Sequence, residues 1–152
     1  MDLSHFNKKN KNTEMVDISK KNKTNREAIA QGRLVIDKNL FNYLKKNKKI
    51  FDNLVNTSKI AGIIASKNTS NIIPLTHNVP IDYIDIKIKL LNQKEIDICA
   101  IGKSNYSTGI EIEVIHAVSI TAITIYDMLK SYKKNIVIKN IKLIKKTGGS
   151  KK

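Results

Sequence analysis

The chain has 152 residues, 41% of them hydrophobic, and a formal net charge of +15 at pH 7. This length favours one domain with a single core, and the lone Cys99 excludes an internal disulfide and a cysteine cluster for zinc. No apolar run reaches the roughly 20 residues of a membrane helix, and residues 1–12 lack the apolar segment of a signal peptide. We therefore expect a cytoplasmic protein.

The positive charge has two interpretations. It would suit nucleic acid, which attracts basic surfaces. However, only Arg26 and Arg33 are arginines, and aromatic residues make up 5% of the chain. Nucleic-acid readers rely on arginine forks and stacked aromatic rings. We therefore favour compositional drift toward lysine, combined with a small phosphorylated ligand, over a nucleic-acid partner.

The first half of the chain begins with a polar, lysine-rich segment, which we expect to form a flexible arm over residues 1–14. Alternating residues predict a short strand over residues 15–19. Residues 26–36 fit a helix or a strand, and the sequence RLVI favours a strand toward the end. Asp37 is placed to cap a short helix that ends at Lys46.

A basic loop is expected over residues 45–49, followed by a helix over residues 53–69 with apolar residues at helical spacing. Both prolines of the chain lie in the next segment, residues 72–80, which is predicted to be irregular. Alternating residues then predict two strands of a hairpin, over 81–91 and 95–102.

The longest predicted element is a helix over residues 108–131, with a last strand over residues 136–144. The helix is apolar nearly all round, as expected of one that is buried on most sides. Five polar side chains fall within about 60° of one another on a helical projection; they are Glu113, His116, Thr124, Asp127 and Ser131. Buried ionisable groups are usually paired or functional, so this stripe is a candidate site.

The order of these elements predicts an α+β fold, in which a ferredoxin-like antiparallel sheet carries helices on one face. We expect three parts: the flexible arm over residues 1–14, a single α+β domain over residues 15–147, and a flexible tail over residues 148–152.

The strongest set of candidates for chemistry is Glu111, Glu113, Asp127 and Lys130. Asp127 and Lys130 are either a surface i,i+3 pair or a functional pair. Glu111 and Asp127 would lie about 24 Å apart along a continuous helix, which is too far for one small site. Either the two ends have separate roles, or antiparallel helices of a symmetric dimer share a site.

Two other motifs are ambiguous. His77 of the motif PLTHN lies between Pro74 and Pro80, which suits a binding site or an exposed loop histidine. The tail KKTGGSKK offers amides and lysines to a phosphate, or is a frayed terminus. The three histidines show no spacing typical of a metal site, so we expect no metal.

Several segments together resemble the MoaC family: MVDIS, TNREA, KIAGIIASKNTSNIIPLTH, TGIEIE, TAITIYDMLKS and KKTGG. The resemblance covers nearly the whole chain. It implies a cyclic pyranopterin monophosphate synthase of molybdenum cofactor biosynthesis, with a ferredoxin-type subunit. It also implies a hexamer built as a trimer of dimers, with sites shared between dimer partners and no metal or organic cofactor.

The implied reaction converts a cyclised dihydro-GTP into cyclic pyranopterin monophosphate and pyrophosphate. By resemblance, Asp127 is the active-site aspartate, and we interpret Asp127 and Lys130 as a proton-transfer pair. Lys146 would hold phosphate or assist ring opening. Six residues fall on or beside the family's substrate-contacting segments, with His77 and Glu113 positioning the substrate; they are Leu75, Thr76, His77, Glu111, Ile112 and Glu113.

One departure from the family concerns a functional lysine, which falls on Phe51 in an ungapped match. Lys48 or Lys49 would replace it if the loop shifted by a few residues. The alternatives are therefore an active lyase, an impaired relative that only binds nucleotide or pterin, and a basic nucleic-acid-binding protein.

Overall fold

A computed structural model of the protein describes residues 3–92, 94–132 and 135–149. Its elements, in chain order, are β1 (Thr24–Val35), α1 (Lys38–Lys46), α2 (Lys48–Lys67), α3 (Thr69–Ile72), β2 (Tyr83–Leu91), β3 (Glu95–Tyr106), α4 (Glu111–Leu129), the 3-10 turn η1 (Lys130–Tyr132) and β4 (Val137–Thr147).

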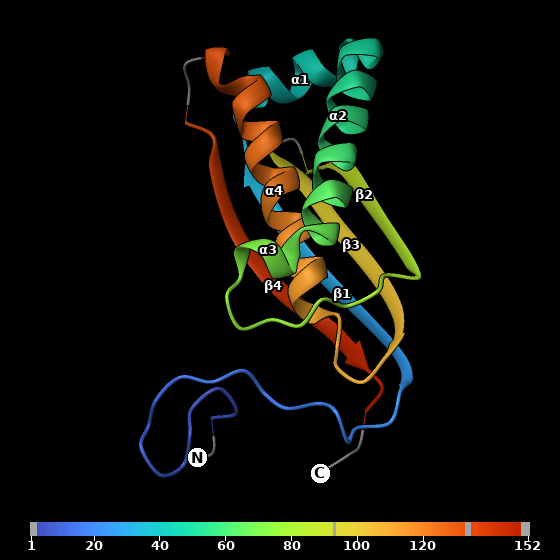
Figure 1. Cartoon of the computed structure of the whole chain (residues 1–152). Helices are drawn as coiled ribbons and strands as arrows, with labels where there is room; N and C mark the ends of the chain where they lie inside the picture. Colours follow the sequence, from blue (N-terminus) through green and yellow to red (C-terminus); the bar gives the residue numbers. More distant parts are fainter. Residues whose placement is uncertain (1–2, 93, 133–134, 150–152) are drawn as a thin grey trace.

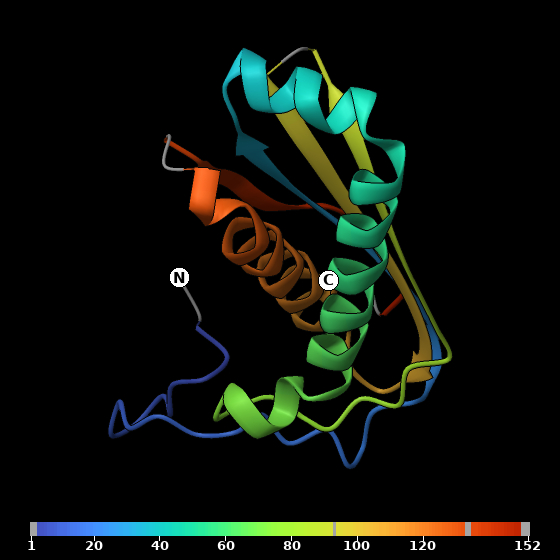
Figure 2. The ribbon, with the colours of Figure 1, turned by 90° about the horizontal axis from the view of Figure 1, so that it is seen from above.

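The four strands form one antiparallel sheet in the order β2-β3-β1-β4. The two long helices α2 and α4 lie side by side on one face of this sheet (Figures 1 and 2). Residues of the buried face alternate with half-buried or exposed ones along β1 and β3. The predicted α+β fold, an antiparallel sheet with helices on one face, is confirmed.

Two glycines of the sheet allow α4 to approach it closely. A side-chain carbon at Gly32 would lie 2.6 Å from Val118 Cγ1, and one at Gly102 would lie 2.7 Å from Val114 Cγ1. Such distances are well inside van der Waals contact, so larger residues would push the helix outward. The close approach buries Val114 and Val118 completely, which contributes roughly 1.5–3 kcal/mol for each side chain.

A third glycine allows the two long helices to pack together. Gly62 of α2 is buried, and a side-chain carbon there would collide with the Thr121 hydroxyl of α4 and lie 2.6 Å from Ile86 Cδ1 of β2. It would also lie 2.9 Å from the Ala117 carbonyl oxygen. Gly62 therefore sets the distance between α2 and α4.

Replacing Gly62 by Ala is expected to destabilise the fold by about 1–3 kcal/mol, because overpacking outweighs the gain in helix propensity. Asn56→Ala is the matched control, since Asn56 is exposed on the same helix and Ala is the better helix former there. Urea unfolding at one protein concentration measures both variants. A Gly62→Ala protein as stable as the Asn56→Ala control would contradict the close packing.

Two predictions near the amino end are wrong. Residues 15–19 contain no strand; their backbone lies along a loop instead, and the Val16 carbonyl accepts a hydrogen bond from His77 at 2.8 Å. The basic loop over residues 45–49 is also absent, because only Asn47 separates α1 from α2. The Asn47 side chain donates to the Tyr43 carbonyl at 2.8 Å and thus closes α1.

Other boundaries shift by a few residues. Asp37 caps α1 as predicted, accepting from the Leu40 amide at 2.8 Å. β3 continues to Tyr106, and β4 continues to Thr147 because both remain paired with β1. The central helix begins later than predicted, at Glu111. The predicted arm and tail lie partly outside the described residues, at 1–2 and 150–152.

Together, α4 and η1 are long and apolar enough to cross a membrane by length and composition alone. This corrects the expectation that no segment of the chain reaches that length. In the fold, the sheet and α2 pack against α4, and Ala117, Ala122 and Ile125 are completely buried. That setting is typical of the core helix of a globular domain.

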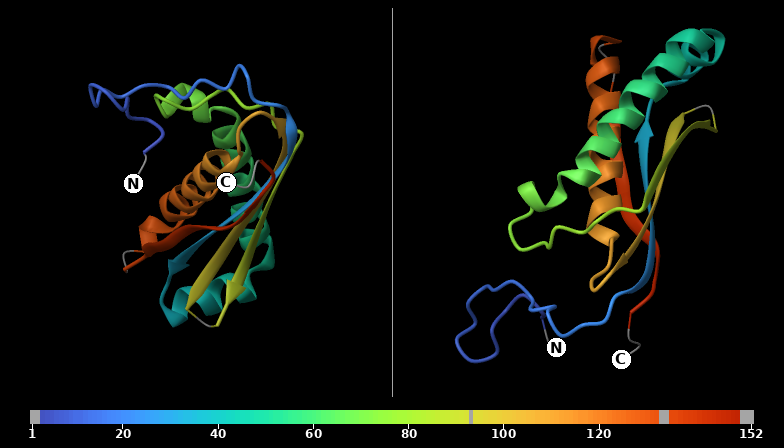
Figure 3. Two further views of the ribbon diagram at one scale, coloured as in Figure 1. Left: turned by 90° about the horizontal axis from the view of Figure 1, so that it is seen from below. Right: turned by 45° about the vertical axis from the view of Figure 1, so that its right-hand side comes forward.

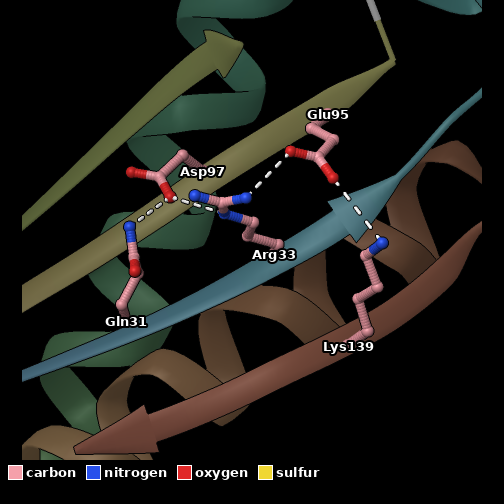
Figure 4. Close-up of polar contacts among 5 residues, drawn as sticks. All are labelled: Gln31, Arg33, Glu95, Asp97 and Lys139. Atoms are coloured by element: carbon pink, nitrogen blue, oxygen red, sulfur yellow. Dashed lines mark hydrogen bonds and ion pairs between the residues drawn. The ribbon is translucent and has the colours of Figure 1, made fainter. Parts of the chain in front are cut away.

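The face of the sheet opposite the helices carries a charged network, drawn in Figure 4. Arg33 of β1 lies between two carboxylates of β3, with Nη1 at 3.2 Å from Glu95 and Nε at 3.5 Å from Asp97. Gln31 donates to Asp97 at 2.7 Å, and Lys139 of β4 lies 3.6 Å from Glu95. The network joins three adjacent strands at the end of the sheet near the β2–β3 turn.

Candidate active site

The amino-terminal segment runs beside the loop that follows α3, near the amino end of α4 (Figure 3). Residues of these three segments line a recess. Its volume is about 260 Å³. Six of its lining residues are the predicted substrate contacts, namely Leu75, Thr76, His77, Glu111, Ile112 and Glu113. Segments that are distant in the sequence therefore bring all six to one place.

The loop side of the recess is held by its own hydrogen bonds. His77 Nε2 lies 2.8 Å from the Val16 carbonyl oxygen, and because a carbonyl only accepts, Nε2 is the protonated nitrogen. Thr76 donates its hydroxyl to the Ile73 carbonyl at 2.9 Å. The imidazole thus fixes the amino-terminal segment against the recess, which the sequence did not indicate.

Glu113 is the buried carboxyl of the recess, with only 3% of its surface exposed. It lies in the first turn of α4, beside Val114 of the core. Burial, with a smaller effect from the negative charge of Glu111, raises the pKa of Glu113 to about 7. A carboxyl with a pKa near neutrality can both accept and donate a proton under physiological conditions.

The raised pKa of Glu113 predicts a specific dependence of stability on pH. The folded protein holds the proton up to a pKa of about 7, against an ordinary value of 4.5. The stability from this group is therefore complete below about pH 4.5 and is lost as the pH rises through 7, by about 3 kcal/mol. Glu113→Gln should remove this loss, so the free energy of unfolding of the variant should rise relative to that of the native protein between pH 4.5 and 8.

Urea unfolding across this pH range tests the prediction. Glu27→Gln is the contrasting control, because the Lys145 hydrogen bond lowers the pKa of Glu27, so stability from that group is lost as the pH falls. Parallel stability curves for Glu113→Gln and the native protein would show that Glu113 is not held neutral.

A second, more basic hollow adjoins the recess and has a volume of about 760 Å³. Lys146 of β4 lies on its border and forms an ion pair with Glu111 of α4 at 2.8 Å. The other carboxylate oxygen of Glu111 is buried without a hydrogen-bond partner. Three further cations line the hollow, namely Lys20, Lys21 and Arg26. This charge suits a phosphorylated group.

Asp127 and Lys130 lie at the opposite end of α4. Lys130 Nζ is 2.6 Å from Asp127 Oδ1, and the side chains are 63% and 66% exposed, respectively. The hydrogen bond and charge of Asp127 raise the pKa of Lys130. Since α4 has 19 residues and is therefore about 28 Å long, one chain does not bring this pair to the recess.

The surface around this pair is unusually apolar for an exposed helix end. Ile123, Tyr126 and Met128 are 53%, 42% and 41% exposed. The beginning of α2, with Lys48, lies at this same end of the molecule (Figure 1). Phe51 is partly buried and packs against the hydrophobic core.

His116, midway along α4, has a structural explanation. Its Nδ1 lies 3.1 Å from the Thr69 hydroxyl of α3, and burial lowers the pKa of His116. The imidazole therefore connects α4 to α3. Among the described residues, no group of three His, Cys, Asp or Glu side chains is arranged to hold a metal ion.

The fold and these two polar helix ends define an α+β protein with a carboxylate–lysine pair at each end of one helix and a basic hollow suited to phosphate. Residues 15–149 match the sequence profile of the MoaC family. The chain belongs to the MoaC family.

Three relatives illustrate the similarity, and each is a cyclic pyranopterin monophosphate synthase. The protein of Peptoclostridium acidaminophilum is 40% identical over 149 residues, which cover 98% of this chain and 94% of the relative. That of Clostridium perfringens (strain SM101 / Type A) is 42% identical, covering 97% and 93%. That of Staphylococcus epidermidis (strain ATCC 12228 / FDA PCI 1200) is 38% identical, also covering 97% and 93%.

Proposed function

We propose that the protein is a cyclic pyranopterin monophosphate synthase, a lyase of molybdenum cofactor biosynthesis. It would convert 3',8-cyclo-7,8-dihydro-GTP into cyclic pyranopterin monophosphate with release of pyrophosphate. The observation that carries this proposal is the 40% sequence identity, over 98% of the chain, to a relative with that activity in its name. The same similarity favours an active lyase over an impaired relative or a nucleic-acid-binding protein.

The recess would bind the purine-derived part of the substrate. Leu75, Thr76 and Ile112 supply its wall, and His77 and Glu113 position the ligand. Lys146 would exchange its ion pair with Glu111 for one with a substrate phosphate, since a lysine ammonium pairs readily with either anion. Neutralising the negative charge of the leaving group, here pyrophosphate, is a large part of the catalysis of phosphoryl transfer.

Asp127 and Lys130 would transfer protons during ring opening and cyclic phosphate formation. Asp127 raises the pKa of Lys130, which keeps the ammonium charged beside the carboxylate that acts as the base. To close a cyclic phosphate, the attacking sugar hydroxyl must lose its proton. The negative charge of the departing pyrophosphate must also be balanced. The carboxylate would accept the proton and the ammonium would balance the charge.

The separation of the two helix ends supports a site shared between subunits. We propose a symmetric dimer in which the recess of one protomer meets Asp127 and Lys130 of its partner, with three such dimers in a cytoplasmic hexamer. The exposed apolar side chains around Asp127 favour this arrangement, because a partner would cover them. Each subunit would contribute its single domain over residues 15–147, and the catalytic unit would be the dimer.

Lys48 is the best substitute for the family lysine that falls on Phe51. The two residues are three positions apart on α2 and so lie on the same side of the helix. Phe51 packs toward the core, whereas Lys48 is exposed in the first turn. Lys48 would therefore present its amine on the side of α2 where the family has a lysine.

Lys48→Ala is expected to lower kcat/KM by about tenfold or more, the equivalent of one charge-assisted hydrogen bond. Lys49→Ala is the matched control, because Lys49 points about 100° away around the helix. If Phe51→Lys raises activity while Lys48→Ala leaves it unchanged, then Lys48 does not replace the family lysine.

The function itself is tested by incubating the purified protein with the cyclised dihydro-GTP and measuring pterin and pyrophosphate together. Equal amounts of the two products are expected. Binding of an unrelated DNA duplex that falls steeply with salt, without any pterin formation, would favour the nucleic-acid alternative.

A further inference from the structure

Arg26 lies where three segments of the chain meet. From β1, its Nε donates to the Tyr106 carbonyl at 3.2 Å, and its Nη2 donates to the Ser107 carbonyl at 3.4 Å. Its Nη1 lies against Gly149, where a side-chain carbon would collide with it. The guanidinium therefore contacts the end of β3 and the turn that follows β4.

Each contacted segment carries one half of the ion pair between Lys146 and Glu111. On one side, Lys146 lies opposite Ala28 of β1 and is followed closely by Gly148 and Gly149. Both glycines have a φ of +91°, which other residues rarely adopt. This tight turn lets the backbone after Lys146 fold over Arg26.

On the other side, the backbone from Tyr106 and Ser107 leads directly into α4. The Glu111 carboxylate fills the space beside Gly109, where a side-chain carbon would displace it. Lys146 reaches this carboxylate at 2.8 Å. The position of Glu111 thus depends on the short loop whose first carbonyls Arg26 holds.

We propose that Arg26 is a positioning residue that holds Lys146 and Glu111 opposite each other at the edge of the recess. Its catalytic consequence rests on the proposed function, whereas its effect on the ion pair does not. The planar guanidinium can donate to two carbonyls and still lie flat against a glycine. A lysine ammonium lacks this geometry, so Arg26→Lys keeps the charge and loses the arrangement.

The ion pair can be tested without any assay of activity. The intact native protein, Arg26→Lys and Arg33→Lys are pulsed with acetic anhydride, and acetylation of each lysine is followed by mass spectrometry. Arg33 is the matched control, because it lies on the same strand but contacts carboxylates at the other end (Figure 4). Lys145, paired with Glu27 at 3.2 Å, is the internal control.

Acetylation of Lys146 is expected to rise by about threefold or more in Arg26→Lys, as for an exposed ion pair that is released. Acetylation of Lys145 should stay the same, and Arg33→Lys should change neither lysine. An unchanged rate at Lys146 in a folded Arg26→Lys protein overturns the proposal. Failure of Arg26→Lys to fold also overturns it, because Arg26 would then support the whole domain.

The catalytic consequence is tested with a double-mutant cycle on kcat/KM. Arg26→Lys should lower kcat/KM by about tenfold in the native background but by less than about twofold when Lys146 is already Ala. Equal losses in both backgrounds overturn an action through Lys146. A native protein that forms no pterin would contradict the proposed function and leave the acetylation result to stand by itself.

Discussion

Replacing Asp127 by Asn is expected to lower kcat by about 100- to 10,000-fold, the range for loss of a general acid or base. The amide keeps the size of the carboxylate but cannot accept a proton. It also removes the charge that raises the pKa of Lys130. The limb of the rate profile that reports deprotonation of Lys130 should therefore move to lower pH in the variant.

Stability should change little in Asp127→Asn, because this ion pair is exposed. Asp85→Asn is the matched control, since Asp85 pairs with Lys59 at 2.5 Å and lies on β2, away from both helix ends. That variant should retain full turnover. Normal turnover in Asp127→Asn would remove Asp127 from the proton-transfer pair.

Mixing two impaired variants is expected to restore part of the activity. In a heterodimer of Asp127→Asn and Lys146→Ala subunits, one site contains both substitutions and the other contains neither. Random pairing makes half of the dimers mixed, each with one native site, so about 25% of native activity should return. Co-expression of the two variants at equal levels provides the randomly paired protein.

The control mixture combines Asp127→Asn with Lys130→Ala, two changes at the same end of α4. Every shared site then contains one of the lesions, so no activity should return. Recovery in the control mixture, or none in the first, would contradict the proposed sharing of sites between subunits.

Much of the fold could be predicted because local chemistry and tertiary packing agree there. The alternation in β2 and the cap at Asp37 were recognisable, since each depends on neighbouring residues. The strand predicted over residues 15–19 failed because alternation also suits an extended segment that pairs with no strand. The junction at Asn47 was missed because a single residue between two helices leaves no change in composition.

The candidate site could be predicted only in part from the sequence. The resemblance identified six of the residues that line the recess, and the length of the central helix indicated that Asp127 lies far from them. The contacts of Arg26 and His77 could not be predicted, because both donate to backbone carbonyls. Every residue carries a carbonyl, so such partners have no sequence signature.

The length of α4 makes the proposed activity depend on concentration. A single protomer holds both halves of the machinery but cannot bring them together, because a rigid helix keeps them apart. Turnover per subunit should then follow the fraction of chains in dimers and fall on dilution below the dissociation constant. Subunit abundance in the cell would thereby act as a threshold for pterin synthesis, without a separate regulatory site.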